Sequence, residues 1–157
     1  MGYTTEFEGR IELDRALDEE LYQFLMKLNE TRRMKRDPKK LEEMGFTGDY
    51  GVEGEFFIDG AGDYGQAEDD SILDYNRPPK TQPGLWCQWM PTLDRKGLEW
   101  DQGEKFYCAD EWMMYLIDRI LKPAGYVANG TIYAQGEDSE DTWELHVRDN
   151  QVSVIYS

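Results

Sequence analysis

The stretch Thr-Trp-Glu-Leu-His-Val-Arg-Asp-Asn-Gln-Val-Ser-Val-Ile-Tyr, residues 142–156, decides the fold class. Apolar and polar side chains alternate through residues 143–147, which predicts a half-buried strand at residues 142–148. Asp149-Asn150 is a candidate two-residue turn, and residues 151–156 follow as a second strand. Together with residues 126–134, these strands predict an antiparallel meander.

Segments upstream of the meander point to the same fold class. Residues 5–13 alternate with period two, and residues 17–34 carry apolar side chains at helical spacing. Residues 85–90 and 97–101 form a candidate strand pair, and residues 111–121 form a second amphipathic helix. The strands cluster, which predicts an α+β fold with a mainly antiparallel sheet and two principal helices packed on one face. The order also hints at an internal βα(ββ) duplication.

The segment between residues 35 and 84 has no clear period. It predicts a helical turn at 39–44, a short strand at 54–58 and a long irregular loop at 59–82. The chain length of 157 residues nevertheless suits one compact domain, so we expect residues 1–157 to form a single domain.

Two patterns in the loop match binding motifs only in part. Residues 60–65 match G-x-G-x-x-G in letters, but no helix opens there, so we expect no phosphate loop. In the acidic segment 59–70, Ala61 and Tyr64 stand where an EF-hand requires a ligand and a glycine. The segment therefore predicts no calcium loop.

The net charge of −16 is unevenly distributed along the chain. Residues 1–40 hold nine basic and nine acidic residues, and residues 41–157 hold eight basic and 24 acidic residues. Such a charge repels free nucleic acid and favours a basic partner, or serves solubility alone. A basic cluster within the neutral part leaves open a separate contact site at residues 32–40; it comprises Arg32, Arg33, Lys35, Arg36, Lys39 and Lys40.

The sequence predicts a cytoplasmic protein without a membrane partner. No apolar run approaches 18 residues, and the start of the chain has no basic region followed by an apolar core. Cys87 and Cys108 form no C-x-x-C, so we expect two free thiols in a reducing compartment.

Residue types argue against most catalytic chemistry. His146 is the single histidine, and we expect it on the solvent side of its strand with Glu144 and Arg148. No serine stands in a G-x-S-x-G turn, and Cys87 is expected to be a buried, inert thiol. We therefore nominate no catalytic residue, metal ligand or cofactor, although an enzyme using paired carboxylates stays open.

Aromatic side chains beside carboxylates and amides gather in residues 98–107, near Trp86 and Trp89. This content is typical of a recognition pocket, and the alternative is that the aromatic residues fill the core. The candidate binding residues are Trp86, Gln88, Trp100, Asp101, Glu104, Lys105, Tyr107, Asn129 and Glu137. The candidate acidic surface comprises Asp59, Asp63, Glu68, Asp69 and Asp70.

Several stretches carry a resemblance: residues 1–5, 74–79, 82–89, 99–107, 111–112, Tyr126, 129–130 and 135–138. On these stretches the chain resembles a family of uncharacterised small acidic proteins found in actinobacteria and bacteriophages, with no assigned activity. The chain departs from the family at Gln102, where glycine is expected, and at Ala134, where tryptophan is expected. The resemblance implies a phage-associated context, similar in kind to stoichiometric inhibitors of host systems.

The leading expectation is thus a non-catalytic interaction protein, phage-encoded, that inhibits a host or defence protein through an acidic, DNA-mimicking surface. Its partner would be a basic protein surface. The alternative is a small-molecule or nucleotide binding protein, a sponge with a pocket lined by tryptophan and tyrosine. An inert domain whose charge only keeps it soluble is also open.

Overall fold

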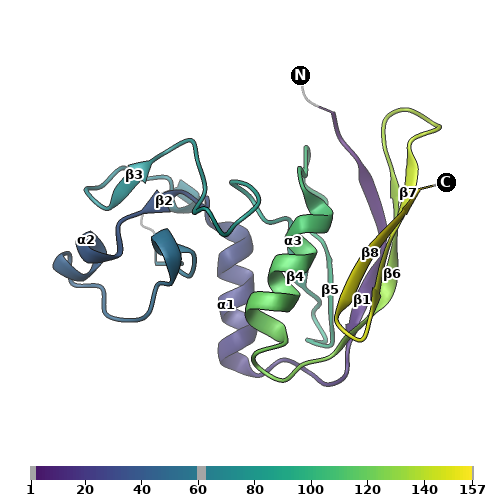
Figure 1. Ribbon diagram of the computed structural model, residues 1–157, viewed down its shortest axis with the longest axis horizontal. Coiled ribbons are helices and arrows are strands. Elements are labelled where there is room, and N and C mark those ends of the chain that lie inside the picture. Colours follow the sequence, from purple (N-terminus) through teal and green to yellow (C-terminus); the bar gives the residue numbers. More distant parts are fainter. Residues whose placement is uncertain (1–2, 60–62, 157) are drawn as a thin grey trace. The chain divides into compact units, whose positions relative to one another are not determined.

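The structure is a computed structural model that describes residues 3–59 and 63–156 (Figure 1). Contacts divide the chain into two compact units: the sheet unit, residues 1–25 and 88–157, and the loop unit, residues 26–87. The single domain expected from the chain length stays a prediction. The 60–65 and 59–70 patterns lie partly outside the described residues, as do Met1 and Gly2 of the first matching stretch.

A six-stranded sheet forms the sheet unit and confirms the predicted α+β class. Its strand order is β4-β5-β1-β6-β7-β8, and every neighbouring pair is antiparallel. The strands are β1 (Glu6–Leu13), β4 (Trp89–Pro91), β5 (Gly97–Trp100), β6 (Ala128–Gln135), β7 (Thr142–Arg148) and β8 (Gln151–Tyr156). The predicted 85–90 strand is shorter and shifted, because only Trp89–Pro91 joins the ladder. The internal duplication stays a prediction.

The predicted meander is present as β6, β7 and β8. Asp149 and Asn150 both have positive φ, 47° and 69°, a turn whose twist matches the strands that it joins. The Asn150 side chain accepts a hydrogen bond from Ala128 N and donates one to the Tyr126 carbonyl, at 2.7 and 3.0 Å. The turn that closes β7 and β8 is thereby tied to the start of β6.

The sheet buries one face and exposes the other. Along β1, Phe7, Ile11 and Leu13 are buried, whereas Glu6 and Glu8 are exposed. The neighbouring strands have the same buried and exposed faces, because residues paired directly across antiparallel strands share a face. The buried face lies under α3 (Ala109–Leu116), whose helix continues as the π turn Ile117–Leu121 and contacts β4 and β8 (Figure 1).

An aromatic cluster fills the buried face around Phe7. The Phe7 ring makes edge-on contacts with Trp89, Trp100, Phe106 and Trp143, at centroid distances of 5.1, 5.5, 5.9 and 5.8 Å. The Trp89 indole also donates a hydrogen bond to the Ala109 carbonyl at 2.8 Å. Trp89 and Phe106 are buried with Phe7, so part of the predicted aromatic content is core. Edge-on pairs add stability beyond the area that the rings bury.

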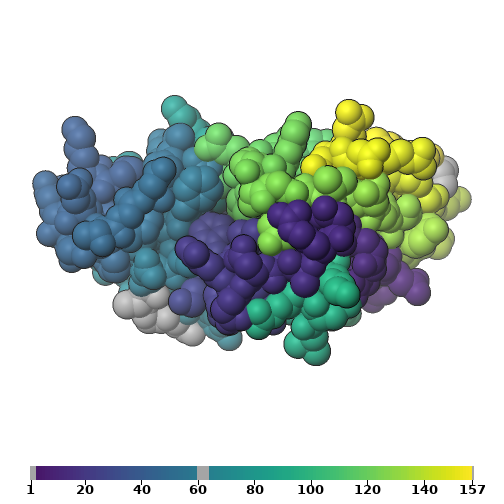
Figure 2. All heavy atoms as spheres, turned by 90° about the horizontal axis from the view of Figure 1, so that it is seen from below, coloured from purple at the N-terminus to yellow at the C-terminus, as the bar shows by residue number. Residues whose placement is uncertain are grey.

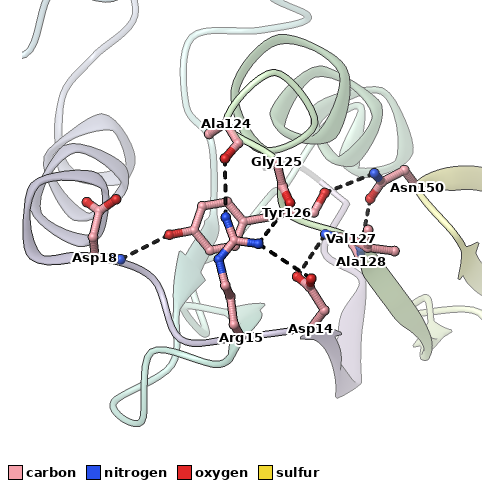
Figure 3. A network of polar contacts seen from close by, with 9 residues as sticks. All are labelled: Asp14, Arg15, Asp18, Ala124, Gly125, Tyr126, Val127, Ala128 and Asn150. Atoms are coloured by element: carbon pink, nitrogen blue, oxygen red, sulfur yellow. Dashed lines mark hydrogen bonds and ion pairs between the residues drawn. The ribbon is translucent and has the colours of Figure 1, made fainter.

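Helix α1, Glu19–Glu30, begins in the sheet unit, where the Asp18 side chain accepts a hydrogen bond from Leu21 N at 2.8 Å. The connection from β1 to α1 holds a polar network (Figure 3). Arg15 donates to the carbonyls of Ala124 and Gly125, and its guanidinium lies 4.1 Å from the centre of the Tyr126 ring. Figure 2 shows this connection at the surface, with purple atoms packed against green atoms of the segment before β6. Arg15 thereby supplies donors to two carbonyls of the turn that follows Leu121.

The predicted helix at 17–34 is too long, because α1 ends at Glu30. The next residues turn away from helical geometry: the Thr31 hydroxyl donates to the Lys27 carbonyl at 2.7 Å, and Arg33 N donates to the Leu85 carbonyl. In the loop unit, β2 (Lys35–Arg36) pairs with β3 (Ile72–Asp74), and α2 spans Pro38–Glu43. The short turns η1 (Val52–Gly54) and η2 (Asp63–Gly65) complete this unit.

The predicted strand at 54–58 is wrong. Glu53 and Gly54 have positive φ, 53° and 80°, which strand geometry does not allow. The Arg33 guanidinium takes up the carbonyls of Gly54, Glu55 and Phe57 as acceptors. Those carbonyls accept hydrogen bonds from a buried cation and not from a neighbouring strand.

Two members of the predicted basic cluster are structural. Arg33 and Arg36 are only 2% and 1% exposed. Arg36 pairs with Asp69 at 3.2 Å, donates to the Ser71 hydroxyl at 2.8 Å and lies 4.3 Å from the Phe57 ring centre. A buried guanidinium requires such partners because losing its hydration is costly. Arg33 and Arg36 are therefore not part of an open basic contact site.

Candidate functional site

A hollow of about 630 Å³ lies at the end of the sheet where β1, β6 and β7 meet. We call it the acidic hollow. Three carboxylates, four aromatic residues and no lysine, arginine or histidine are among its lining residues. The lining residues are Glu6, Phe7, Glu8, Trp100, Gln102, Tyr133, Ala134, Gln135, Thr142, Trp143 and Glu144.

The strand register places an exposed tyrosine between two carboxylates. Glu8 pairs with Tyr133, and Tyr133 pairs with Glu144, so the three form one row across β1, β6 and β7. Directly opposed residues have Cβ atoms about 5 Å apart on the same face. Tyr133 is 56% exposed, which leaves its ring open to a ligand between the two acids. The next row along the strands consists of Glu6, Gln135 and Thr142.

The edge of β1 is open beside this row. β1 pairs with β6 along its whole length, from Glu6 to Leu13, but with β5 only at Ile11 and Glu12. The described ladder therefore leaves residues 6–10 without a strand partner on the β5 side. Trp100, the last residue of β5, and Gln102 line the hollow instead.

Two arginines of the sheet unit already have acidic partners. Arg10 forms ion pairs with Glu12 and Asp94, and Arg95 pairs with Glu19. Among the residues that the structure describes, no ion pair involves Glu6 or Glu8. Glu144 Oε1 lies 3.0 Å from His146 Nε2. Within the hollow, Glu6 and Glu8 are therefore the carboxylates whose charge no ion pair compensates among the described residues.

A second hollow, of about 580 Å³, lies further along the same sheet face. It includes His146 and Arg148 and no carboxylate in its lining. Thr131 and His146 pair with each other one step along the face from Tyr133 and Glu144. The two hollows thus differ in charge, because three carboxylates line the first, whereas His146 and Arg148 line the second. His146 is half-buried on this face with Glu144, consistent with the alternation in the sequence.

Of the nine candidate binding residues, Trp100 lines the acidic hollow and Asn129 lines the second hollow. Asn129 Oδ1 also accepts a hydrogen bond from Asp149 N at 2.9 Å. Gln88 donates to the Glu104 carbonyl at 2.8 Å and accepts from the Trp100 indole at 3.3 Å. The structure gives Gln88 a role in holding the turn after β5.

The other candidate binding residues lie apart from both hollows. Glu104, Lys105 and Tyr107 are exposed, and Trp86 is half-buried in the loop unit. Asp101 accepts a hydrogen bond from Gly103 N at 2.8 Å. Glu137 accepts one from Thr4 N at 2.6 Å, which ties the segment before β1 to the β6–β7 hairpin.

The candidate acidic surface has mixed roles. Asp69 is the partner of Arg36. Partial burial would raise the pKa of Asp69, but hydrogen bonds from Ser71 and the positive charge of Arg36 lower it overall. Asp59 accepts a hydrogen bond from the Tyr50 hydroxyl at 3.5 Å. Glu68 and Asp70 are exposed, and the side chain of Asp63 lies outside the described part.

The sequence interpretation missed the central row, Glu8, Tyr133 and Glu144. Alternation already places Glu6 and Glu8 on the polar face of their strand, and this was the available signal. The register that brings them beside Tyr133 joins residues more than 120 positions apart. Gln102 and Ala134, the two departures from the resembled family, also line the hollow.

Other reactive groups are weakly placed for chemistry. Partial burial and the neighbouring Glu111 carboxylate raise the pKa of the Cys108 thiol to about 11, which disfavours the nucleophilic thiolate at neutral pH. Within residues 3–59 and 63–156, no group of three or more His, Cys, Asp and Glu side chains is arranged to hold a metal ion. No helix in the described ranges has the length and apolar character needed to cross a membrane.

Comparisons with known proteins add no relative: no family model, no curated protein and no solved structure matches the chain.

Proposed function

We propose that this chain is a non-catalytic interaction protein that binds a basic protein surface through the open face of its sheet. The observation that carries the proposal is the row of Glu8, Tyr133 and Glu144 in a hollow whose lining has no cationic residue. The proposal includes a cytoplasmic location, which the lack of a disulfide framework in the sequence favours. It also includes inhibition of a host or defence factor, as the resemblance implies.

Charge supports this assignment at two length scales. The net charge of −16 attracts a basic partner over the distance of a Debye length, about 10 Å at 0.1 M salt. The acidic hollow then offers the carboxylates of Glu6 and Glu8, which form no ion pair among the described residues. Long-range charge raises the rate of encounter, and local complementarity selects the contact surface.

The test compares two variants with the same change of charge. Glu6→Gln/Glu8→Gln/Glu144→Gln removes the carboxylates of the hollow, and Glu20→Gln/Glu42→Gln/Glu68→Gln removes three exposed carboxylates elsewhere. Affinity purification with mass spectrometry from host lysate identifies proteins that wild type captures, and binding is then measured with the purified partner. We expect the hollow variant to bind about tenfold more weakly, because three surface pairs of about 0.5 kcal/mol each sum to that factor.

The salt dependence provides the second readout. Raising the salt from 0.1 to 1 M shortens the Debye length to about 3 Å and should weaken the complex. Equal binding by both triple variants, or a complex indifferent to salt, would contradict binding through this face.

A small-molecule binding protein is the second candidate, and the hollow itself favours it. Its volume of about 630 Å³ lies within the usual range for ligand sites, and Trp100, Tyr133 and Trp143 contribute to its lining. Three carboxylates oppose a phosphate group, so the nucleotide version of this candidate is the weaker one. A thermal-shift screen of nucleotides and organic cations tests it, since a ligand that binds the native state raises the melting temperature.

A further inference from the structure

We propose that the acidic hollow is a socket for a single arginine side chain of the partner. This inference rests on the proposed function, because it names the group that the same site recognises. Its basis is the alternation of carboxylate, aromatic ring and carboxylate along Glu8, Tyr133 and Glu144.

The row offers a guanidinium two kinds of contact at once. The exposed ring of Tyr133 provides a face on which a planar cation can stack. Glu8 and Glu144 stand on either side of that ring and provide acceptors for the N–H groups in the plane of the guanidinium. A lysine ammonium is compact and strongly hydrated, so it uses the ring face less well.

Neutral polar residues extend the same recognition around the carboxylates. Gln102 and Gln135 line the hollow and supply amide oxygens that accept hydrogen bonds. A guanidinium carries five N–H donors and no acceptor, so a lining rich in acceptors suits it. Glu6 and Glu8 have no ion pair among the described residues, so the incoming cation displaces no internal partner there. At Glu144 it competes with His146, whose Nε2 lies 3.0 Å from Glu144 Oε1.

The spacing of the strands disfavours a metal ion in the same place. Glu8 and Glu144 stand on β1 and β7, which are separated by β6. Neighbouring strands lie about 4.8 Å apart, so these two strands are roughly 10 Å apart. A divalent ion needs its oxygen ligands within about 2.5 Å, whereas a planar organic cation bonded on both sides spans a larger gap. Phosphate is disfavoured by the sign of the charge.

The experiment is an NMR titration of the full ¹⁵N-labelled chain with three amino-acid amides. N-acetyl-arginine amide is the probe, and N-acetyl-citrulline amide is its neutral counterpart of nearly the same shape. N-acetyl-lysine amide carries a charge that is not planar, so it tests whether the site requires a planar cation. We expect arginine to bind at least tenfold more tightly than citrulline and several-fold more tightly than lysine. The shifted signals should belong to residues 6–8, 133–135 and 142–144.

Variants assign the binding to the row. Glu8→Gln and Tyr133→Leu should each weaken arginine binding at least threefold, whereas Tyr133→Phe keeps the ring and should retain it. Arg148→Gln in the second hollow and Glu68→Gln in the loop unit are controls that should leave binding unchanged. The ¹⁵N spectrum of each variant shows whether it is folded. If Tyr133→Leu misfolds, Glu8→Gln compared with Tyr133→Phe still tests the row.

Three results would overturn the inference. Citrulline binding as tightly as arginine would remove the role of the charge, and equal binding of lysine would remove the preference for a flat cation. Capture of a basic protein through this face without any arginine response would refute the socket and leave the proposed function standing. An arginine response at the hollow without any captured partner would refute the proposed function and leave the socket.

Discussion

Replacing Arg36 tests whether the loop unit depends on its buried cation. Arg36 is 1% exposed and donates to Asp69, the Ser71 hydroxyl and the Gly65 carbonyl. Arg36→Met keeps an unbranched apolar stem of similar length and removes the charge and the donors. The change therefore isolates the polar contacts more cleanly than truncation to alanine.

The expected cost is about 3 kcal/mol of unfolding free energy. Hydrogen bonds to a charged group contribute about 1.5–3 kcal/mol, and the lost contact with the Phe57 ring adds about 0.5–1 kcal/mol. The side chain of Asp69 is 30% exposed, so water recovers part of the loss at that carboxylate, and we place the total below the upper sum.

Denaturant unfolding followed by circular dichroism gives the stability, and hydrogen exchange with mass spectrometry locates the change. We expect faster exchange in residues 63–74, which Arg36 holds, and little change in the six-stranded sheet. Lys40→Met is the control, because Lys40 is exposed and its pair with Glu43 at 3.5 Å is a surface contact. Such a pair contributes below about 1 kcal/mol. A loss below about 0.5 kcal/mol for Arg36→Met, or equal losses for both variants, would refute the reasoning.

Two further predictions concern titrating groups. Hydrogen bonds from the Thr92 hydroxyl and Lys96 N, followed by Arg10, lower the pKa of Asp94 to about 2, from an ordinary value of 3.8. The ionised carboxylate stabilises the fold above pH 3.8, and this contribution is lost as the pH falls through about 2. The melting temperature of Asp94→Asn should therefore depend less on pH between 3.8 and 2 than that of wild type. An unchanged dependence would contradict this. Because the pKa of Cys108 is about 11, alkylation of this exposed thiol by iodoacetamide should be slow at pH 7 and accelerate towards pH 11. Intact-mass measurements with Cys108→Ser as control check this, and fast modification at pH 7 would contradict it.

The strands of the sheet unit were predictable because their signals are local. Residues 142–148 and 151–156 have the predicted bounds, and the turn between them contains two residues that tolerate positive φ. Strand β1 shows period two throughout, so one face was known to be polar before its neighbours were known. Local alternation was sufficient here because one side of each strand is buried.

The loop unit was predicted poorly because its order depends on distant partners. Residues 54–58 look like a strand from their composition, but their carbonyls point to Arg33, more than 20 positions earlier. The basic cluster likewise looked like a contact surface, whereas Arg36 is buried against Asp69. Composition cannot distinguish a buried arginine from an exposed one, because burial depends on partners that lie elsewhere in the sequence.

By itself the sequence determined the α+β class, the strong acidity and the polar side of each strand, because these follow from periods of two or 3.6 residues and from summed charge. Only the tertiary structure decided which acids meet which aromatic ring. The pairing of Glu8 with Tyr133 and of Tyr133 with Glu144 depends on strand register. A shift of one residue would turn each of these side chains to the opposite face, so the socket exists only once the sheet has closed in register.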